Sequence, residues 1–194
     1  MKTSIAILSV AIALTGLSLR ATAQSSSADS LKARPSFSIG ADGGFSAGSF
    51  KHTNGWNIGG SLQADIPIVQ QLYFSANASY LNFYGRTNID GTGVSSPAIH
   101  FLPVKAGLKL FVLSDIYVQA DAGAGFILNK DEVGSQRTAA FIYSPQVGIK
   151  LPLTGNSFID ASALYEASTK YTSGVDNTKV NFFGLRLAYG LSTK

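Results

Sequence analysis

The sequence contains no cysteine and only two histidines, His52 and His100. A chain without cysteine can form neither a disulfide framework nor a lipid-modified N-terminal cysteine, and two histidines leave little for a zinc site. Aspartate, glutamate, lysine and arginine together make up 13% of the residues, whereas soluble domains contain about 25%. The chain therefore has too little charge to cover an ordinary water-facing surface.

The sequence also lacks an apolar run of the roughly 20 residues that a transmembrane helix needs. Its longest apolar stretch, residues 5–19, follows Lys2 and precedes the small residues at positions 21–23. This layout is typical of a secretory signal peptide. We therefore predict a cleaved signal peptide over residues 1–23 and a short polar lead-in over residues 24–35.

Runs of basic residues are absent as well. The net charge of +4 and the isoelectric point of about 9.3 come from scattered lysines and arginines. Proteins that bind nucleic acids usually gather such residues into stripes or patches that follow the phosphates. We expect no nucleic-acid partner, and the length after the signal peptide suits a single domain.

From residue 36 onward, eight segments alternate apolar and polar residues with period two. Such alternation, with turn-forming residues between the segments, predicts β-strands. Pro103 and Pro145 fall inside two of the strands, where each removes a backbone donor, so we expect a bulge or a late strand start at these points. The predicted strands are residues 36–45, 56–66, 72–83, 99–111, 116–128, 139–151, 158–168 and 180–191.

The connections between these strands alternate in length. Outer-membrane barrels have short periplasmic turns and longer outer loops, and an even number of strands returns both termini to the periplasm. The pattern therefore predicts an all-β fold over residues 36–194, an eight-stranded antiparallel up-and-down transmembrane β-barrel. The short connections are residues 67–71, 112–115 and 152–157, and the long ones are residues 46–55, 84–98, 129–138 and about 169–179.

Each predicted strand has one face without charge, which carries large apolar residues such as Ile39, Val104 and Leu108. A lysine or arginine on the lipid-facing surface would cost about 2–4 kcal/mol at the bilayer midplane. We therefore predict that the uncharged face contacts lipid and that the charged residues fill the lumen as a network of ion pairs, leaving no wide pore. The predicted network consists of Asp42, Asp65, Lys105, Lys109, Asp121, Lys150, Asp160, Glu166 and Arg186.

A soluble lipocalin-like barrel is an alternative, because it shows the same alternation with the apolar face turned inward. Its water-facing surface would then consist of serine, glycine, asparagine and aspartate, with few lysines and glutamates. The alternating connection lengths would also have no explanation. Aromatic residues near many strand ends favour the transmembrane barrel, whose interfaces carry aromatic girdles.

Patterns for catalysis and for metal or cofactor binding are weak in this sequence. Neither His52 nor His100 is followed two residues later by the serine of a lipid A deacylase-like barrel. Asp160 and Glu166 are six residues apart, which is roughly 20 Å along a strand and too far for a pair of carboxyl groups in acid/base catalysis. The glycine clusters lack the lysine of a phosphate-binding loop. We expect no enzyme, no cofactor and no metal.

The last predicted strand carries Gly184, Leu187 and Tyr189 in the Gly-x-x-Φ-x-aromatic spacing of a C-terminal β-signal. With this motif, residues 36–191 resemble the small outer-membrane β-barrel family of Bacteroidetes-type bacteria, which is related in layout to the OmpA transmembrane domain and to PorT-like barrels. The resemblance implies outer-membrane lipid as the surroundings and the barrel-insertion machinery as an assembly partner. The tail, residues 190–194, departs from the usual terminal aromatic residue.

These features favour a structural or interaction protein that acts through its outer loops, because binding residues usually lie on loops held by a rigid scaffold. The alternative is a narrow transport barrel for a small or apolar solute, as in OmpW-like proteins. The predicted outer loops carry charges of both signs. They identify no particular ligand or partner.

Overall fold

The computed structural model describes residues 34–87, 95–133, 135–171 and 178–193. The predicted signal peptide lies outside the described residues, as do residues 24–33 of the polar lead-in. In the described part of the chain, no helix is both long enough and apolar enough to cross a membrane.

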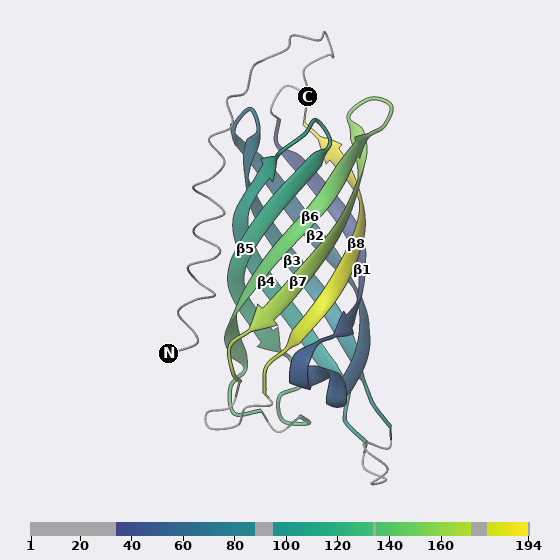
Figure 1. The fold of residues 1–194 in the computed structure, drawn as a ribbon, viewed down its shortest axis with the longest axis vertical. Helices are drawn as coiled ribbons and strands as arrows, with labels where there is room; N and C mark the ends of the chain where they lie inside the picture. The colour runs from purple at the N-terminus through teal and green to yellow at the C-terminus, as the bar shows by residue number, and fades with distance from the viewer. Residues whose placement is uncertain (1–33, 88–94, 134, 172–177, 194) are drawn as a thin grey trace. The chain divides into compact units, whose positions relative to one another are not determined.

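Eight antiparallel strands close into one barrel in chain order, with β8 paired to β1 (Figure 1). A short 3-10 helix, η1 (Gly48–His52), lies between β1 and β2. The predicted architecture is confirmed, and the predicted strand ends differ from the observed ones by at most three residues. The strands are β1 (Ser36–Ser46), β2 (Asn54–Val69), β3 (Leu72–Gly85), β4 (Ile99–Phe111), β5 (Ile116–Ile127), β6 (Ala139–Pro152), β7 (Ser157–Ser168) and β8 (Asn181–Ser192).

Closure between β1 and β8 leaves the sheet without an unpaired edge. The ladder runs from the Ser36–Ser192 pair to the Ser46–Phe182 pair without a register shift. Just beyond it, the amide of Thr193 donates to the carbonyl of Pro35 at 2.8 Å. A closed sheet satisfies its backbone groups internally, as the hydrocarbon layer of a membrane requires.

The two ends of the barrel differ. The β2–β3, β4–β5 and β6–β7 turns are short and lie at the end where β8 finishes, whereas η1 and the longer connections lie at the opposite end (Figure 1). In outer-membrane barrels the short turns face the periplasm and the longer loops face outward. We call these two ends of the molecule the turn end and the loop end.

Neither proline produces the bulge or late strand start that the sequence predicted, so this expectation was wrong. The β3–β4 ladder keeps one register on both sides of Pro103, and the β6–β7 ladder does the same around Pro145. Each ladder loses only the pair of its proline and the pair of one adjacent residue. Both prolines remain paired with β5, through Gly125 and Ala120. The missing N–H group of each proline therefore affects one neighbouring strand, and the flanking pairs hold the register.

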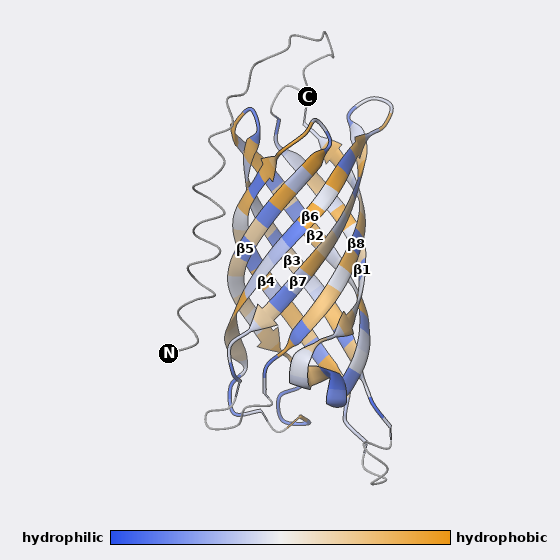
Figure 2. Ribbon diagram, viewed as in Figure 1, coloured by the Kyte–Doolittle hydropathy of each residue, from blue (hydrophilic) through white to orange (hydrophobic). Residues whose placement is uncertain are grey.

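Apolar and polar residues alternate along the strands (Figure 2). The outward positions hold large apolar side chains that stay exposed, with Phe45 at 72%, Leu185 at 66% and Ile39 at 64% of their full surface. Soluble monomers rarely expose a continuous apolar surface larger than a few hundred Å². The exposed wall is what a barrel surrounded by acyl chains requires, and the soluble lipocalin-like alternative would bury these side chains instead.

Candidate functional site

All nine charged residues of the predicted network lie at inward positions of the strands. Asp42 and Lys150 are half-buried. The other seven are buried, with at most 6% of their surface exposed: Asp65, Lys105, Lys109, Asp121, Asp160, Glu166 and Arg186. Charged groups are almost never fully buried unless they are paired, so their contacts within the lumen decide how the interior is organised.

Lys109 connects strands on opposite sides of the lumen. Its ammonium group lies 2.7 Å from the Asp65 carboxylate on β2 and 3.3 Å from the Asp160 carboxylate on β7. Asp160 also accepts a hydrogen bond from the Tyr117 hydroxyl at 2.7 Å and lies 3.5 Å from the Arg186 guanidinium. This cluster joins β2, β4, β5, β7 and β8 across the turn-end half of the lumen.

A second ion pair crosses the lumen nearer the middle of the barrel, where Lys105 on β4 donates to Glu166 on β7. Beside it, Asp121 accepts hydrogen bonds from the Ser75 hydroxyl and the Gln119 amide, both at 2.8 Å. Glu166 is therefore paired with a lysine of a facing strand, as Asp160 is, and the two carboxylates do not face each other.

The two half-buried charges lie at the margins of this network. The Lys150 ammonium lies 3.1 Å from the Ser36 hydroxyl and 3.8 Å from the centre of the Phe158 ring. Asp42 lines an internal cavity of about 10 Å³ together with Glu166, which is room for about one water molecule. One oxygen of each of these two carboxylates is buried without a hydrogen-bond partner among the described residues.

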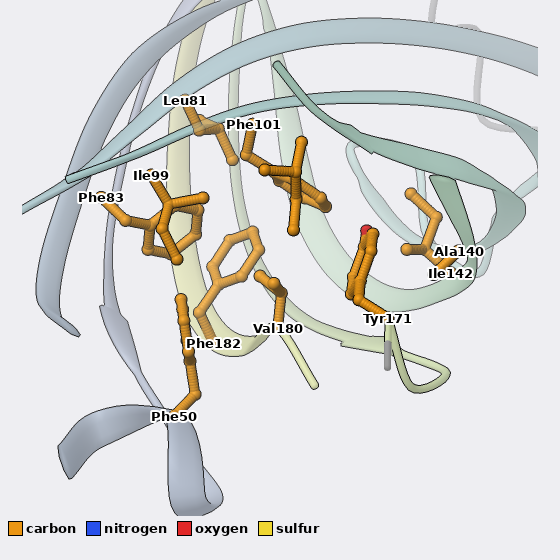
Figure 3. Packing of buried hydrophobic residues seen from close by; sticks show 11 residues of the cluster. Phe50, Leu81, Phe83, Ile99, Phe101, Ala140, Ile142, Tyr171, Val180 and Phe182 are labelled. Carbon is orange, nitrogen blue, oxygen red and sulfur yellow. The ribbon is translucent and has the colours of Figure 1, made fainter. Parts of the chain in front are cut away.

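An apolar cluster fills the loop end of the lumen, and the sequence pattern did not predict it (Figure 3). Its centre is Phe83, whose ring lies edge-on to Phe50 at 5.2 Å and to Phe182 at 5.2 Å. Strands β3, β4, β5, β6 and β8 contribute inward-facing apolar side chains at this level. The cluster consists of Phe50, Leu81, Phe83, Ile99, Phe101, Ile127, Ala140, Ile142, Tyr171, Val180 and Phe182.

Two connections complete this cluster. Helix η1 contributes Phe50, which is 4% exposed, and the β7–β8 connection contributes Tyr171, which is 1% exposed. The Tyr171 hydroxyl donates to the Gly125 carbonyl at 2.8 Å. Burial, with a smaller contribution from the Glu166 carboxylate, raises the pKa of Tyr171, so its hydroxyl stays protonated and can donate. The lumen is thus filled by ion pairs toward the turn end and by apolar side chains toward the loop end.

Glycines on the inner wall make room for the large rings of the lumen. A Cβ atom at Gly148 would overlap the Tyr117 ring, and one at Gly190 would overlap the Phe158 ring. Tyr117 is also the hydrogen-bond donor to Asp160. The glycine positions therefore determine where the aromatic partners of the ionic network can lie.

We predict that Gly148→Ala destabilises the folded barrel by about 1–3 kcal/mol, the usual cost of overpacking. The methyl group would displace the Tyr117 ring and its hydrogen bond to Asp160. Gly43→Ala is the matched control, because a Cβ there would lie 3.7 Å from its nearest neighbour, an ordinary contact. Urea unfolding followed by gel mobility of the folded form measures both variants, and equal midpoints would contradict the prediction.

The residues of the predicted β-signal lie on both faces of β8. Gly184 is buried and faces the lumen, whereas Leu187 and Tyr189 are exposed on the outer wall at 59% and 49%. The two histidines lie near the loop end: His52 ends η1, and His100 is the second residue of β4. Within the described ranges, no group of three or more His, Cys, Asp or Glu residues could hold a metal ion.

A closed eight-stranded barrel with an uncharged outer wall, an ionised lumen and long connections at one end defines a small outer-membrane β-barrel. The chain belongs to the family of the outer membrane protein beta-barrel domain, whose model matches residues 9–190. The protein is therefore placed in the outer membrane, where lipid surrounds its wall. No curated protein matches the sequence.

Solved structures with the same fold come from distant sequences. OprG from Pseudomonas aeruginosa is 9% identical with a TM-score of 0.59, and the match covers 84% of this chain and 97% of OprG. AlkL is 14% identical with a TM-score of 0.55, covering 89% of this chain and 95% of AlkL. Ail from Yersinia pestis is 19% identical with a TM-score of 0.50, covering 84% of this chain and all of Ail. At such identities the similarity establishes the fold alone.

Proposed function

We propose that this protein is a closed, non-enzymatic barrel that acts through its outer loops as a structural or interaction protein of the outer membrane. The filled lumen carries this proposal. Ion pairs centred on Lys109 and Lys105 cross the lumen from strand to strand, and the cluster around Phe83 occupies the loop end. An eight-stranded barrel has an interior just wide enough for its side chains to fill it.

The loop end is the part of the molecule suited to contact a partner. A rigid scaffold holds the connections in place, and binding residues commonly lie on such loops. Hydrogen bonds tie the connections to the barrel, for example from the Ala47 amide to the Asn181 carbonyl of β8 at 2.7 Å. The charged residues described at this end are Lys51, Arg86, Lys130, Asp131, Glu132, Arg137, Lys170 and Lys179.

We predict that the purified protein conducts no ions in planar bilayers, because the ion pairs and the apolar cluster occupy the lumen of the described barrel. Liposomes containing the folded protein should likewise retain small polar solutes. Large single-channel currents or selective solute flux would reject the structural role. A porin reconstituted in the same way serves as the positive control.

Transport of a small apolar solute is the second candidate function, and the apolar cluster at the loop end favours it. Phe50 covers this cluster from η1, outside the strands, so an apolar solute could enter by displacing it. If the barrel transports such a solute, Phe50→Ala should change the rate of its uptake into liposomes. If the barrel is closed, the wild type and the variant should both show none.

We propose, in addition, that maturation removes residues 1–23 and leaves residues 36–194 as the barrel domain after a short lead-in. The β-signal residues Gly184, Leu187 and Tyr189 would then be read by the barrel-insertion machinery. The spacing of these residues supports membership of the Bacteroidetes-type, PorT-like group. The mass of the mature protein tests the cleavage site.

A further inference from the structure

At the loop end of β3, the outward positions carry polar and aromatic side chains. Tyr80, Asn82 and Tyr84 occupy outward positions, and Arg86 follows two residues later. Tyr80 and Tyr84 are 45% and 39% exposed, and Arg86 is exposed. Outward positions nearer the turn end of this strand hold apolar residues such as Phe74. The outward side chains of β3 therefore change from apolar to polar and aromatic toward the loop end.

Neighbouring strands extend this group of side chains. The Trp56 ring of β2 stacks on Tyr84, with centroids 4.2 Å apart and planes at 20°. The Tyr80 hydroxyl is hydrogen-bonded to Nδ1 of His100 on β4 at 2.8 Å, and His100 is paired with Asn82 in the ladder. Because this bond uses Nδ1, the opposite ring nitrogen, Nε2, can bond to a ligand. These residues form one connected surface across β2, β3 and β4.

Arg86 completes the surface at its outer edge. Its amide donates to the Thr53 carbonyl at 2.8 Å. A Cβ atom built at Gly55 would lie 3.8 Å from the Arg86 Nε, so the guanidinium lies beside the start of β2. We call the six side chains the rim patch: Trp56, Tyr80, Asn82, Tyr84, Arg86 and His100.

The rim patch lies at the level of the membrane interface. Tryptophan and tyrosine concentrate where the hydrocarbon meets the headgroups. The stretch from Tyr80 to Arg86 is roughly 20 Å along the strand, long enough to run from the acyl boundary into the headgroup layer. Outward rings also lie at the loop end on the other side of the barrel, at Phe141, Tyr143, Tyr165 and Phe183.

We propose that the rim patch binds the phosphorylated sugar headgroup of a glycolipid in the outer leaflet. The Arg86 guanidinium matches a phosphate by bidentate hydrogen bonds. Asn82 is the polar side chain between Tyr80 and Tyr84 on this outward face, and an amide side chain can donate to or accept from a sugar hydroxyl. The exposed faces of Trp56 and Tyr84 offer apolar contact to a sugar ring. The site depends on the placement in the outer membrane but not on the proposed loop function.

Binding of bisphosphorylated lipid A to the folded protein in detergent tests this proposal, with native mass spectrometry as the readout. Arg86→Ala should weaken binding about tenfold, since it removes a hydrogen-bonded charge pair. Arg86→Lys keeps the charge but loses the bidentate geometry and should fall in between. The His100 ring stacks on Tyr80 with centroids 6.1 Å apart. His100→Phe keeps a ring at this position but removes the ring nitrogens, and should also weaken binding.

Arg34→Ala is the matched control, because Arg34 is a cation at the turn end, where it contacts the Thr193 carbonyl at 3.5 Å. It should bind lipid A as the wild type does. A gel comparing heated and unheated samples establishes that each variant is folded. The proposal is overturned if Arg86→Ala and His100→Phe bind as tightly as Arg34→Ala, or if dephosphorylated lipid A binds the wild type as tightly as the phosphorylated form.

Discussion

Replacing Lys109 with methionine should destabilise the folded barrel by about 3–5 kcal/mol, the usual cost of removing one partner of a buried ion pair. Lys109 is fully buried and contacts two carboxylates, Asp65 at 2.7 Å and Asp160 at 3.3 Å. Asp160 would keep its contacts with Arg186 and Tyr117. Among the described residues, Asp65 would keep the hydrogen bond from the Gln63 amide, which donates at 2.9 Å.

Urea unfolding in lipid vesicles measures this effect, with Lys51→Met as the control. Lys51 is exposed on η1, so its replacement should change the free energy of unfolding by less than about 0.5 kcal/mol. Adding Asp65→Asn to Lys109→Met should recover part of the loss, because the unpaired carboxylate is then neutral. Equal unfolding of Lys109→Met and Lys51→Met would show that the ionic network contributes nothing to stability.

Phe83→Ala should cost a similar amount, about 3–5 kcal/mol, because it removes a buried ring and leaves a cavity. Phe83 has no exposed surface, and its ring contacts Phe50, Phe101 and Phe182 in the apolar cluster. The loss would therefore loosen both the strands and η1 at the loop end.

Phe83→Leu is the matched control, since leucine keeps most of the apolar volume and should cost no more than about 1.5 kcal/mol. The same urea titration compares the two variants. Proteolysis of the loops in the folded protein adds a local readout, and Phe83→Ala should be cut near η1 faster than the control. If the two variants unfold alike, the cluster does not stabilise the loop end.

The closed barrel, and which side chains of each strand point inward or outward, could be predicted from the sequence because both depend on local patterns. Strand facing follows from period two, so Val104 and Lys105 had to point to opposite sides. The alternating connection lengths predicted short turns at one end of the barrel and longer connections at the other. Neither inference requires knowledge of which residues meet across the lumen.

The partners within the lumen could not be predicted, because they depend on how far neighbouring strands are shifted around the barrel. Lys109 of β4 meets Asp160 of β7, and no sequence spacing relates these two positions. The prolines failed as signals for a related reason. Whether the missing N–H of Pro103 would face β3 or β5 depends on the hydrogen-bonding phase of the ladder, which the sequence does not reveal.

The apolar cluster did leave a signal in the sequence. Where a strand approaches the loop end, adjacent apolar residues occupy both faces, as in Phe83-Tyr84, Phe101-Leu102 and Phe182-Phe183. One member of each pair points to lipid and the other must point into the lumen. When only the lipid-facing residues of each strand are considered, the inward residue of each pair looks like an ordinary extra apolar residue. The cluster at the loop end then goes unnoticed.

The uncharged wall of the barrel contacts acyl chains, while the charged and aromatic interior is sealed from them. Phe101 and Leu102 are neighbours on β4, and Phe101 points inward whereas Leu102 points outward. The two positions therefore lie on opposite faces of the wall at nearly the same depth in the membrane. In a Trp56→Phe background, which removes the only tryptophan, a single tryptophan placed at either position can be quenched by brominated lipids. We expect strong quenching for Leu102→Trp and little for Phe101→Trp, and the reverse order would contradict the assignment of the two faces.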